Sequence, residues 1–453
     1  MDTKALRQKI LDLAIHGKLV PQDPNDEPAS VLLERIRAEK ERLIKEGKIK
    51  KGKKSAKTSD KPHYPFELPK GWVWCKLDDI AYVGTGATPL TACKYYYENG
   101  NIAWINSSST KVPFIAKASN FITQKAIEET NCLVYPKGTL VIAMYGEGKT
   151  RGQISELLID AATNQACAAV RPYSEATKKY LKLFFEGNYL HIRALAEGGN
   201  QQNLSVGKIQ NYEIPLPPLD EQKRILDKAK ELLLQIDNIE VGKSVCQKYI
   251  NQAKSKVLDL AIHGKLVSQD PNDEPAIELL KRINPKAEIT CDTPQYGKLP
   301  KGWCLCKISS VVDIVNGKSQ KNVESPTGKY PIYGSGGIIG KAMEYTCLAG
   351  STIIGRKGTI NHPIFVEENF WNVDTAFGMK ANNQILEDKY FYCFCLYFDF
   401  SKLDKSSALP SLTKTAIGNL ILPIPPLAEQ QRIVAKIEEL FAQLDKIESS
   451  LQA

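Results

Sequence analysis

One segment of this chain occurs twice with a single change. The ten residues LDLAIHGKLV stand at Leu11–Val20 and again at Leu258–Val267, and both copies continue into QDPNDEPA after Pro21 in the first and Ser268 in the second. A match of this length does not arise from shared helix propensity, so it marks an internal duplication. The chain is therefore predicted to fold as two related halves.

Two further pairs of segments support the duplication. LPKGWVWCK at Leu68–Lys76 returns as LPKGWCLCK at Leu299–Lys307, and PLPPLDEQKRI at Pro215–Ile225 returns as PIPPLAEQQRI at Pro423–Ile433. The stretches between these shared boxes differ, so the boxes form a common framework that carries variable domains. The expected parts, in chain order, are an N-terminal helix at 1–20, a variable domain at 21–216, a central helix at 217–264, a second variable domain at 265–424 and a C-terminal helix at 425–453.

The framework after each proline-rich box is predicted to be helical. Asp220 and Glu221 follow the first box, where a helix N-terminus favours negative charge. Apolar residues then alternate at spacings of four and three, the heptad pattern of helices that pack on helices. They are Ile225, Ala229, Leu232, Ile236 and Ile239 in the central helix, and Ile433, Ile437, Leu440, Leu444, Ile447 and Leu451 in the C-terminal helix. Gly17 and Gly264 are predicted to end the helices that contain the repeat.

The order of these helices predicts a cyclic, pseudo-two-fold arrangement. In the central helix the heptad region leads into the repeated box, whereas the second heptad region lies at the C-terminus and its box at the N-terminus. We expect the two terminal helices to lie end to end and antiparallel to the central one. The variable domains contain short β-type runs, such as Leu140–Met144 and Thr352–Ile354. The predicted fold class is α+β, with two β-rich α/β domains separated by long antiparallel coiled-coil helices.

The charge and the hydropathy of the chain limit its possible partners and its location in the cell. The net charge is +9, and its densest part is the basic insertion at 40–61, with ten Lys or Arg against three acidic residues and no counterpart in the second half. The basic insertion is predicted to run from a helix into a disordered linker, which is either a solvated tail or a non-specific contact with nucleic-acid phosphates. No run reaches about 18 apolar residues and the N-terminus does not resemble a signal peptide, so we expect a cytoplasmic protein that does not enter the membrane.

Motifs for catalysis and metal binding are weak. Two Cys-x-Cys pairs, at 304–306 and 393–395, are either half of a zinc site or cysteines of core strands. AMYGEGKT has Ala143 where a phosphate-binding loop needs its first glycine. His16 and His263, identical in the repeat, are expected to belong to the framework. We therefore expect no catalytic, cofactor or metal site on this chain.

These boxes, in this order, resemble those of the specificity subunit of type I restriction-modification enzymes. The resemblance rests on the boxes above and on YPIYGSGGIIG, TIIGRKGT and FWNVDTAF in the second variable domain, and it covers nearly the whole chain. It implies two target-recognition domains, each of which reads one half of a bipartite, asymmetric double-stranded DNA target, joined by helices that set the spacer.

The resemblance also assigns the chemistry to other chains. It implies that adenine methyltransferase subunits and ATP-dependent restriction or translocase subunits are partners, and that S-adenosylmethionine, ATP and Mg²⁺ bind there. Because the two-fold framework offers the same docking surface twice, we expect two methyltransferase subunits. This chain is then not an enzyme. The alternatives are a DNA methyltransferase in its own right and an assembly scaffold that does not bind DNA.

DNA recognition needs amide, cationic and hydroxyl side chains that reach base edges or phosphates. Such residues gather in loops at matching places in the two halves: GGNQQN precedes the first proline-rich box as SSALPS precedes the second, and YGEGKTR matches GRKGT. The candidate DNA-binding residues of the first half are Tyr145, Lys149, Arg151, Asn200, Gln201, Gln202 and Asn203. Those of the second half are Tyr333, Ser335, Arg356, Lys357, Ser406, Ser407 and Ser411.

Overall fold

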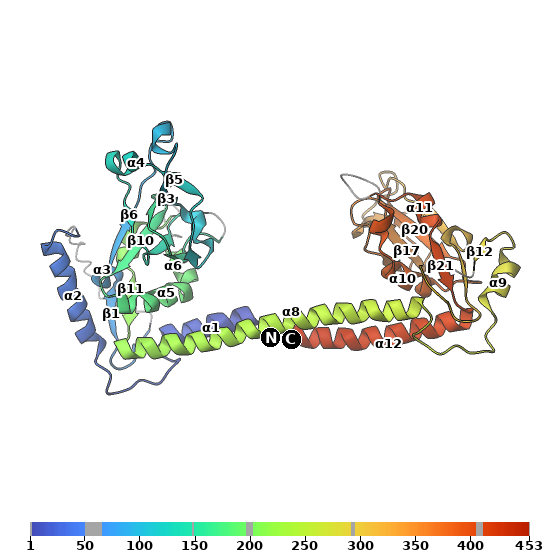
Figure 1. Cartoon of the computed structure of the whole chain (residues 1–453), viewed down its shortest axis with the longest axis horizontal. Helices are drawn as coiled ribbons and strands as arrows, with labels where there is room; N and C mark the ends of the chain where they lie inside the picture. The colour runs from blue at the N-terminus through green and yellow to red at the C-terminus, as the bar shows by residue number, and fades with distance from the viewer. Residues whose placement is uncertain are drawn as a thin grey trace. The chain divides into compact units, whose positions relative to one another are not determined.

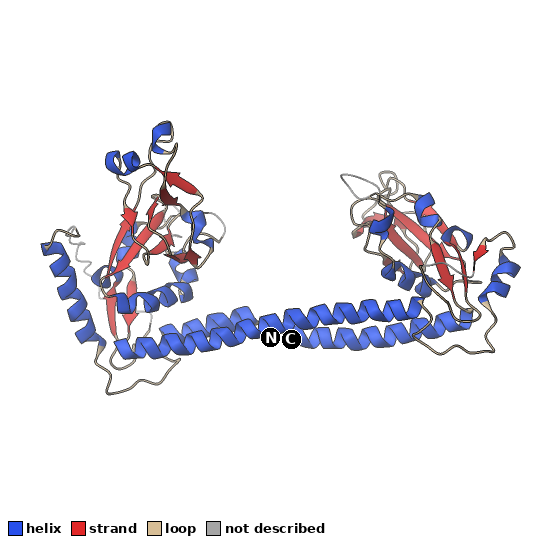
Figure 2. Cartoon of the chain, viewed as in Figure 1, coloured by secondary structure: helices blue, strands red, loops and turns tan. Residues whose placement is uncertain are grey.

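The computed structural model describes residues 2–49, 66–146, 149–195, 203–290, 295–404 and 411–452. They fold into two compact units, Asp2–Val241 and Gly242–Ala453. Each unit contains β-sheets and the end of a long helix (Figures 1 and 2). The predicted α+β class with two β-rich domains is confirmed.

The first unit is built on three sheets. Their strand orders are β1-β11, β2-β10-β7-β8-β4 and β5-β3-β9-β6. The strands are β1 Val73–Lys76, β2 Ala81–Thr85, β3 Ile102–Ile105, β4 Phe114–Ile115, β5 Asn120–Ile122, β6 Val134–Tyr135, β7 Leu140–Ala143, β8 Ile154–Leu157, β9 Ala161–Thr163, β10 Cys167–Pro172 and β11 Glu213–Leu216. The helices are α1 Thr3–Ile15, α2 Ala29–Lys45, α3 Leu77–Ile80, α4 Gln124–Glu129, α5 Lys178–Gly187, α6 Tyr189–Ala194, α7 Val206–Gln210 and the first part of α8 Leu219–Ile262, with 3-10 turns η1 Lys94–Tyr96, η2 Ser107–Lys111 and η3 Glu175–Thr177.

The second unit repeats much of this plan. Its sheets have the orders β12-β13-β21, β14-β20-β17-β18 and β16-β15-β19. The strands are β12 Ile289–Thr290, β13 Cys304–Lys307, β14 Val312–Asn316, β15 Tyr330–Gly334, β16 Gly337–Ala342, β17 Ser351–Gly355, β18 Ile364–Val366, β19 Trp371–Asn372, β20 Ala376–Ala381 and β21 Ile421–Ile424. The helices are the last part of α8, α9 Ala276–Ile283, α10 Asp388–Tyr397, α11 Lys414–Gly418 and α12 Leu427–Gln452, with 3-10 turns η4 Ile308–Ser310 and η5 Phe400–Leu403.

The long helices pair in antiparallel fashion within each unit. In the first unit, Arg7 of α1 forms ion pairs with Asp237 and Glu240 of α8. In the second unit, Lys254 of α8 forms ion pairs with Asp445 (2.6 Å) and Glu448 (3.2 Å) of α12. Helix α8 itself runs through Gly242 without a break. The predicted antiparallel helix pairs are therefore confirmed.

The heptad seams are shorter than the sequence suggests. Ile225 and Ile236 of α8 and Ile433 of α12 are buried, but Ile239 is 37% exposed and Ile447 is 50% exposed. The first turns of α8 and of α12 belong to the hydrophobic core of their own unit, whereas Ile239 and Ile447 lie beyond those cores. A two-helix pair covers only a narrow stripe, so the outer heptad residues stay in contact with water.

The repeated box ends each helix as predicted. Gly17 and Gly264 both have a φ of 65°, the left-handed conformation of a glycine that ends a helix. The Lys18 N–H donates to the Leu13 carbonyl (2.8 Å), and Lys265 makes the same bond one repeat later. His16 Nδ1 lies 2.6 Å from the Asp12 carbonyl in this turn. These residues are framework.

The cysteine pairs lie in the core. Cys304 and Cys306 are buried in β13, while Cys393 and Cys395 are buried in α10, a helix rather than the strand expected. Burial raises the pKa of the Cys393 thiol to about 12. Such thiols stay protonated and pack as small apolar side chains.

The basic insertion is described only in part. Helix α2 covers its beginning and ends at Lys45, in agreement with the predicted helix, whereas residues 50–61 lie outside the described residues. Among the residues that the structure describes, no helix is both long and apolar enough to cross a membrane.

Candidate DNA interface

The two units place the same strands in the same register. Strand β7 pairs with β10 so that Ala143 faces Cys167, and β17 pairs with β20 so that Gly355 faces Ala376. In each unit the next residues of the chain leave the sheet as one of the candidate loops. The match predicted between YGEGKTR and GRKGT is therefore a match of backbone position.

The same backbone hydrogen bonds hold both loops. The Tyr145 N–H donates to the Ala166 carbonyl (3.4 Å), and the Lys357 N–H donates to the Thr375 carbonyl (3.3 Å). Tyr145 in the first unit thus occupies the position of Lys357 in the second. An aromatic ring and an ammonium group recognise different base edges, so the shared scaffold presents different chemistry at this position.

A second candidate segment joins each loop. The Leu204 N–H donates to the Met144 carbonyl (3.1 Å), and the Leu412 N–H donates to the Arg356 carbonyl (2.9 Å). The candidates that directly precede these leucines are Asn203 and Ser411, and Ser411 also forms a β-bridge with Lys357. The structure therefore brings together loops that are far apart in the sequence. The other candidates of these segments, Asn200, Gln201, Gln202, Ser406 and Ser407, lie outside the described residues.

A third segment reaches the same place in both units. Strands β3 and β9 run parallel, as do β15 and β19, and the loops that follow β3 and β15 begin at equivalent residues. In the second unit this loop contains Ser335, which lies against Gly355 at the end of β17. Tyr333 is half-buried and packs its ring edge on Phe370, so its role is partly structural.

The equivalent loop of the first unit was missed by sequence reasoning. It is the segment Asn106–Lys111, where the Asn106 side chain accepts a hydrogen bond from the Ser108 N–H (3.0 Å) and caps η2. The sequence feature that could have indicated this loop is a run of asparagine, serine and threonine directly after a β-type run. Its correspondence to the serine and glycine loop after β15 emerges only from strand pairing.

Helix α6 clamps the loop of the first unit. The Tyr189 hydroxyl donates to the Lys149 carbonyl (2.6 Å), and Arg193 donates to the Tyr189 hydroxyl (3.0 Å) and to the Arg151 carbonyl (3.3 Å). The Arg151 Nε atom is buried without a hydrogen-bond partner among the described residues. This loop is therefore held by its backbone, which leaves the Lys149 side chain exposed.

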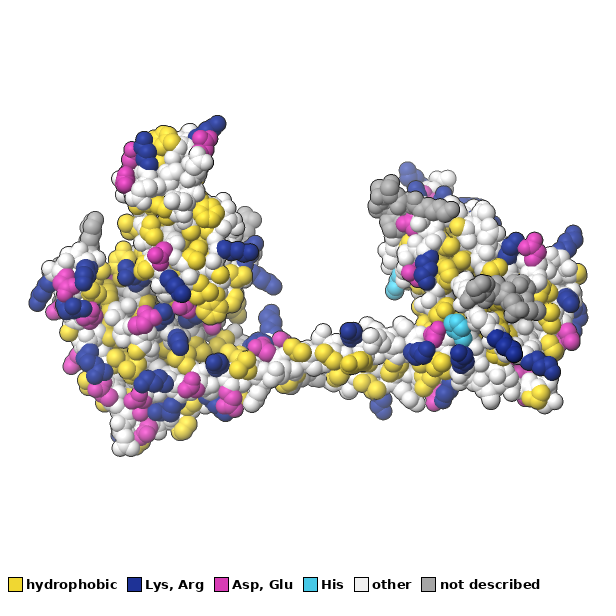
Figure 3. Space-filling view, in the orientation of Figure 1, with side chains coloured by type: hydrophobic (Ala, Val, Ile, Leu, Met, Phe, Trp, Pro, Cys, Tyr) yellow, Lys and Arg dark blue, Asp and Glu magenta, His cyan; other side chains and the backbone are white. Residues whose placement is uncertain are grey.

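The cations of the loops are available to a ligand. Within the described ranges, Lys149, Arg356 and Lys357 belong to no ion pair, and Lys357 is exposed. On the face in Figure 3, lysine and arginine side chains alternate with acidic ones over each unit rather than forming a single basic patch.

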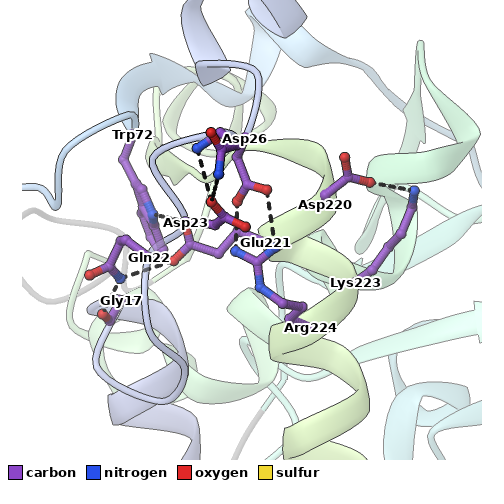
Figure 4. A network of polar contacts seen from close by, with 10 residues as sticks. Gly17, Gln22, Asp23, Asp26, Trp72, Asp220, Glu221, Lys223 and Arg224 are labelled. Atoms are coloured by element: carbon purple, nitrogen blue, oxygen red, sulfur yellow. Dashed lines mark hydrogen bonds and ion pairs between the residues drawn. The ribbon is translucent and has the colours of Figure 1, made fainter.

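A duplicated polar network connects the sheets of each unit to its long helix, and Figure 4 shows the network of the first unit. In the first unit, Glu221 at the start of α8 accepts hydrogen bonds from Trp72 Nε1 (2.9 Å) and Gln22 Nε2 (3.0 Å). Arg224, one turn later, pairs with Asp26 through both guanidinium nitrogens (3.1 and 2.6 Å). Figure 4 shows these side chains converging from the repeated box, the LPKGW box and α8.

The second unit repeats the network with equivalent residues. Glu429 accepts hydrogen bonds from Trp303 Nε1 (3.0 Å) and Gln269 Nε2 (3.1 Å), and Arg432 pairs with Asp273. In both units burial raises the pKa of the central glutamate, Glu221 or Glu429, against the opposing effect of its hydrogen bonds. All three shared boxes thus meet in one network.

The chain is similar to known specificity subunits of type I restriction enzymes. A family model for the "Type I restriction modification DNA specificity domain" matches residues 69–244 and 300–453. The type I restriction enzyme EcoAI specificity subunit of Escherichia coli is 27% identical, over 98% of this chain and 90% of its own length. The EcoEI specificity subunit of the same species is 26% identical, over 99% of this chain and 91% of its own length.

Solved structures share the fold. The HsdS subunit from Thermoanaerobacter tengcongensis superposes with a TM-score of 0.51 at 19% identity and covers 85% of this chain and 95% of its own. A chain from a structural study of complex assembly and conformational transition of the type I R-M system superposes with a TM-score of 0.61 at 18% identity, over 86% of this chain and 94% of its own. The chain therefore belongs to the type I restriction-modification DNA specificity family, and it is a non-catalytic specificity subunit.

Proposed function

We propose that the two units read the two halves of a bipartite, asymmetric DNA target. The observation that carries the proposal is the repeated loop scaffold, in which three segments meet at equivalent backbone positions and present different side chains. One scaffold with different side chains suits two different half-sites. Backbone N–H groups and lysines hold phosphates, while the amide, aromatic and guanidinium groups contact base edges.

The proposed partners rest on the duplicated framework of shared boxes and helices. A framework that repeats the same residues offers the same docking surface twice, which suits two copies of an adenine methyltransferase subunit. Restriction or translocase subunits join this complex, and S-adenosylmethionine, ATP and Mg²⁺ bind to those partners in the cytoplasm. The role of this chain is to direct them to the target.

Exchange of one recognition domain tests the proposal. The chain is co-expressed with its methyltransferase, and the modified adenines are mapped by long-read sequencing. Replacing Pro62–Tyr212 by the corresponding region of another family member should change one half-site and leave the other intact. A change in both half-sites would mean that the units do not read DNA independently, and the proposal would fail.

Mass measurement of the purified complex tests the partnership. We expect two methyltransferase subunits for each copy of this chain. A ratio of one to one would contradict the duplicated docking surface while leaving the DNA assignment in place.

A further inference from the structure

The β15–β16 hairpin exposes two consecutive isoleucines. Ile332 pairs with Gly340 and Tyr333 pairs with Ile338, so Ile339 lies in a β-bulge without a partner across the hairpin. In a regular strand, neighbouring side chains point to opposite faces of the sheet. Here Ile338 is 63% exposed and Ile339 is 55% exposed. Both apolar side chains are therefore exposed to solvent at a bulge, an irregularity that changes the direction of a side chain.

This hairpin tip lies beside the cationic loop of the second unit. A Cβ atom at Gly334 would lie 3.8 Å from both Ile339 Cγ2 and Thr375 Oγ1. The Thr375 carbonyl accepts the N–H groups of Arg356 (2.7 Å) and Lys357 (3.3 Å). A Cβ atom at Gly355, directly before Arg356, would lie 3.1 Å from Ser335 of the hairpin turn, so the hairpin that carries the isoleucines adjoins the loop that carries the two cations.

The combination of exposed isoleucines and nearby cations restricts the chemical class of the ligand. Exposed isoleucines beside cations without ion pairs among the described residues fit a polyanion that also presents an apolar group. In the major groove of DNA, the 5-methyl group of thymine is that apolar group, and it stands among acceptors and phosphates. We propose that Ile338 and Ile339 contact a thymine methyl group in the half-site that this unit reads. The inference rests on the proposed function and assigns the chemistry of one contact within it.

The test removes the methyl group and the isoleucines separately. The complex with methyltransferase subunits is prepared with Ile338→Ala/Ile339→Ala, and the matched control is Leu348→Ala, another exposed apolar residue of this unit. The DNA is the mapped target duplex, in which each thymine of the relevant half-site is replaced in turn by deoxyuridine. The domain exchange described above identifies that half-site.

We expect one deoxyuridine replacement to weaken binding by the wild-type complex about tenfold, the low end for loss of one methyl group from an apolar contact. The double variant should bind the thymine duplex about tenfold more weakly and be indifferent to that replacement. The control should behave as the wild type. A double variant that keeps the sensitivity to deoxyuridine, or a half-site without thymine on either strand, would overturn the inference.

A third variant separates this inference from the proposed function. Arg356→Ala/Lys357→Ala should weaken binding to the same duplex whatever the isoleucines do. If this variant binds weakly while the isoleucine variant binds as the wild type, only the thymine contact is wrong. If both bind as the wild type, the second unit does not read DNA through this loop, and the proposed function fails with the inference.

Discussion

At the residue scale, the turn that ends the helix in each copy of the repeated box requires a glycine. Gly17 and Gly264 combine a left-handed backbone with close packing on the proline and tryptophan of the LPKGW box, and a Cβ at either would lie 3.1 Å from the tryptophan ring. The proline ring lies closer still, inside van der Waals contact. Backbone conformation and space both exclude a side chain there.

Gly264→Ala should therefore destabilise the second unit by roughly 2 kcal/mol, because strain in the left-handed region adds to the forced movement of Pro300. Gly242→Ala is the matched control, since this helical glycine has open space around it. It should stabilise α8 by about 0.5–1 kcal/mol. Chemical denaturation of the two variants measures both effects, and equal effects of the two substitutions would contradict this explanation.

The α6 clamp gives a second prediction at this scale. Tyr189→Phe removes the hydroxyl that donates to the Lys149 carbonyl, and one such hydrogen bond is worth about 1 kcal/mol, or roughly fivefold in affinity. We expect the variant to discriminate less well between bases in the half-site of the first unit. Discrimination in the other half-site should not change. Methylation rates on single-base variants of the target measure this. Tyr249→Phe, at an exposed tyrosine of α8, is the control, and a loss shared by both variants would argue against the clamp.

At the scale of elements, each long helix begins inside a buried polar network. Glu221 and Glu429 are almost fully covered, and each is satisfied by a tryptophan and a glutamine from the two other boxes. A buried carboxylate is tolerated only when it is hydrogen-bonded, so the three boxes depend on one another. This dependence explains why they recur together in both halves.

The raised pKa of Glu221 makes the stability of the first unit depend on pH. A carboxyl group whose folded pKa lies above its unfolded value of about 4.3 binds its proton more tightly in the folded state. The contribution of this carboxyl group to the free energy of unfolding is therefore fully present below the unfolded pKa. It is lost as the pH rises through the raised folded pKa. In Glu221→Gln, the melting temperature should therefore fall less between pH 4 and pH 7 than it does in the wild type. The exposed Glu41→Gln is the control, and an unchanged pH profile in Glu221→Gln would refute the assignment.

At the scale of the whole molecule, the paired helices are expected to set the spacer between half-sites. Inserting one heptad into both helical layers, near Leu233 in α8 and Ala442 in α12, lengthens both layers by the same amount and keeps the heptad repeat of each helix. We expect a changed spacer length and two unchanged half-sites in the methylation motif. An altered half-site sequence would show that the helices contribute to base recognition.

The basic insertion supplies the remaining prediction for the whole molecule. Deleting Lys48–Lys61 removes a cluster of lysines, so the affinity for DNA should fall less steeply with salt concentration because fewer counterions are released. The methylated sequence should not change, since phosphate contacts position a protein without specifying bases. Affinities over a salt series, together with the mapped motif, measure both outcomes, and a new motif would contradict the electrostatic role.

The sequence by itself predicted the duplication, the antiparallel helices and the glycines that end them. These features depend on neighbours three or four positions apart, or on identity between the two copies, and both can be seen in one sequence. It also placed candidate loops at matching positions, because those loops follow recognisable strands or precede the shared boxes.

Only the tertiary structure decided which loops meet. The equivalence of Asn106 with the loop after β15, the clamp of Tyr189 on Lys149 and the bulge at Ile339 all depend on strand register or on contacts between distant segments. The same holds for Ile239 and Ile447, which follow the heptad pattern and yet lie exposed. A sequence pattern states which face of an element is apolar, whereas the number of neighbours that cover that face is a property of the assembled fold.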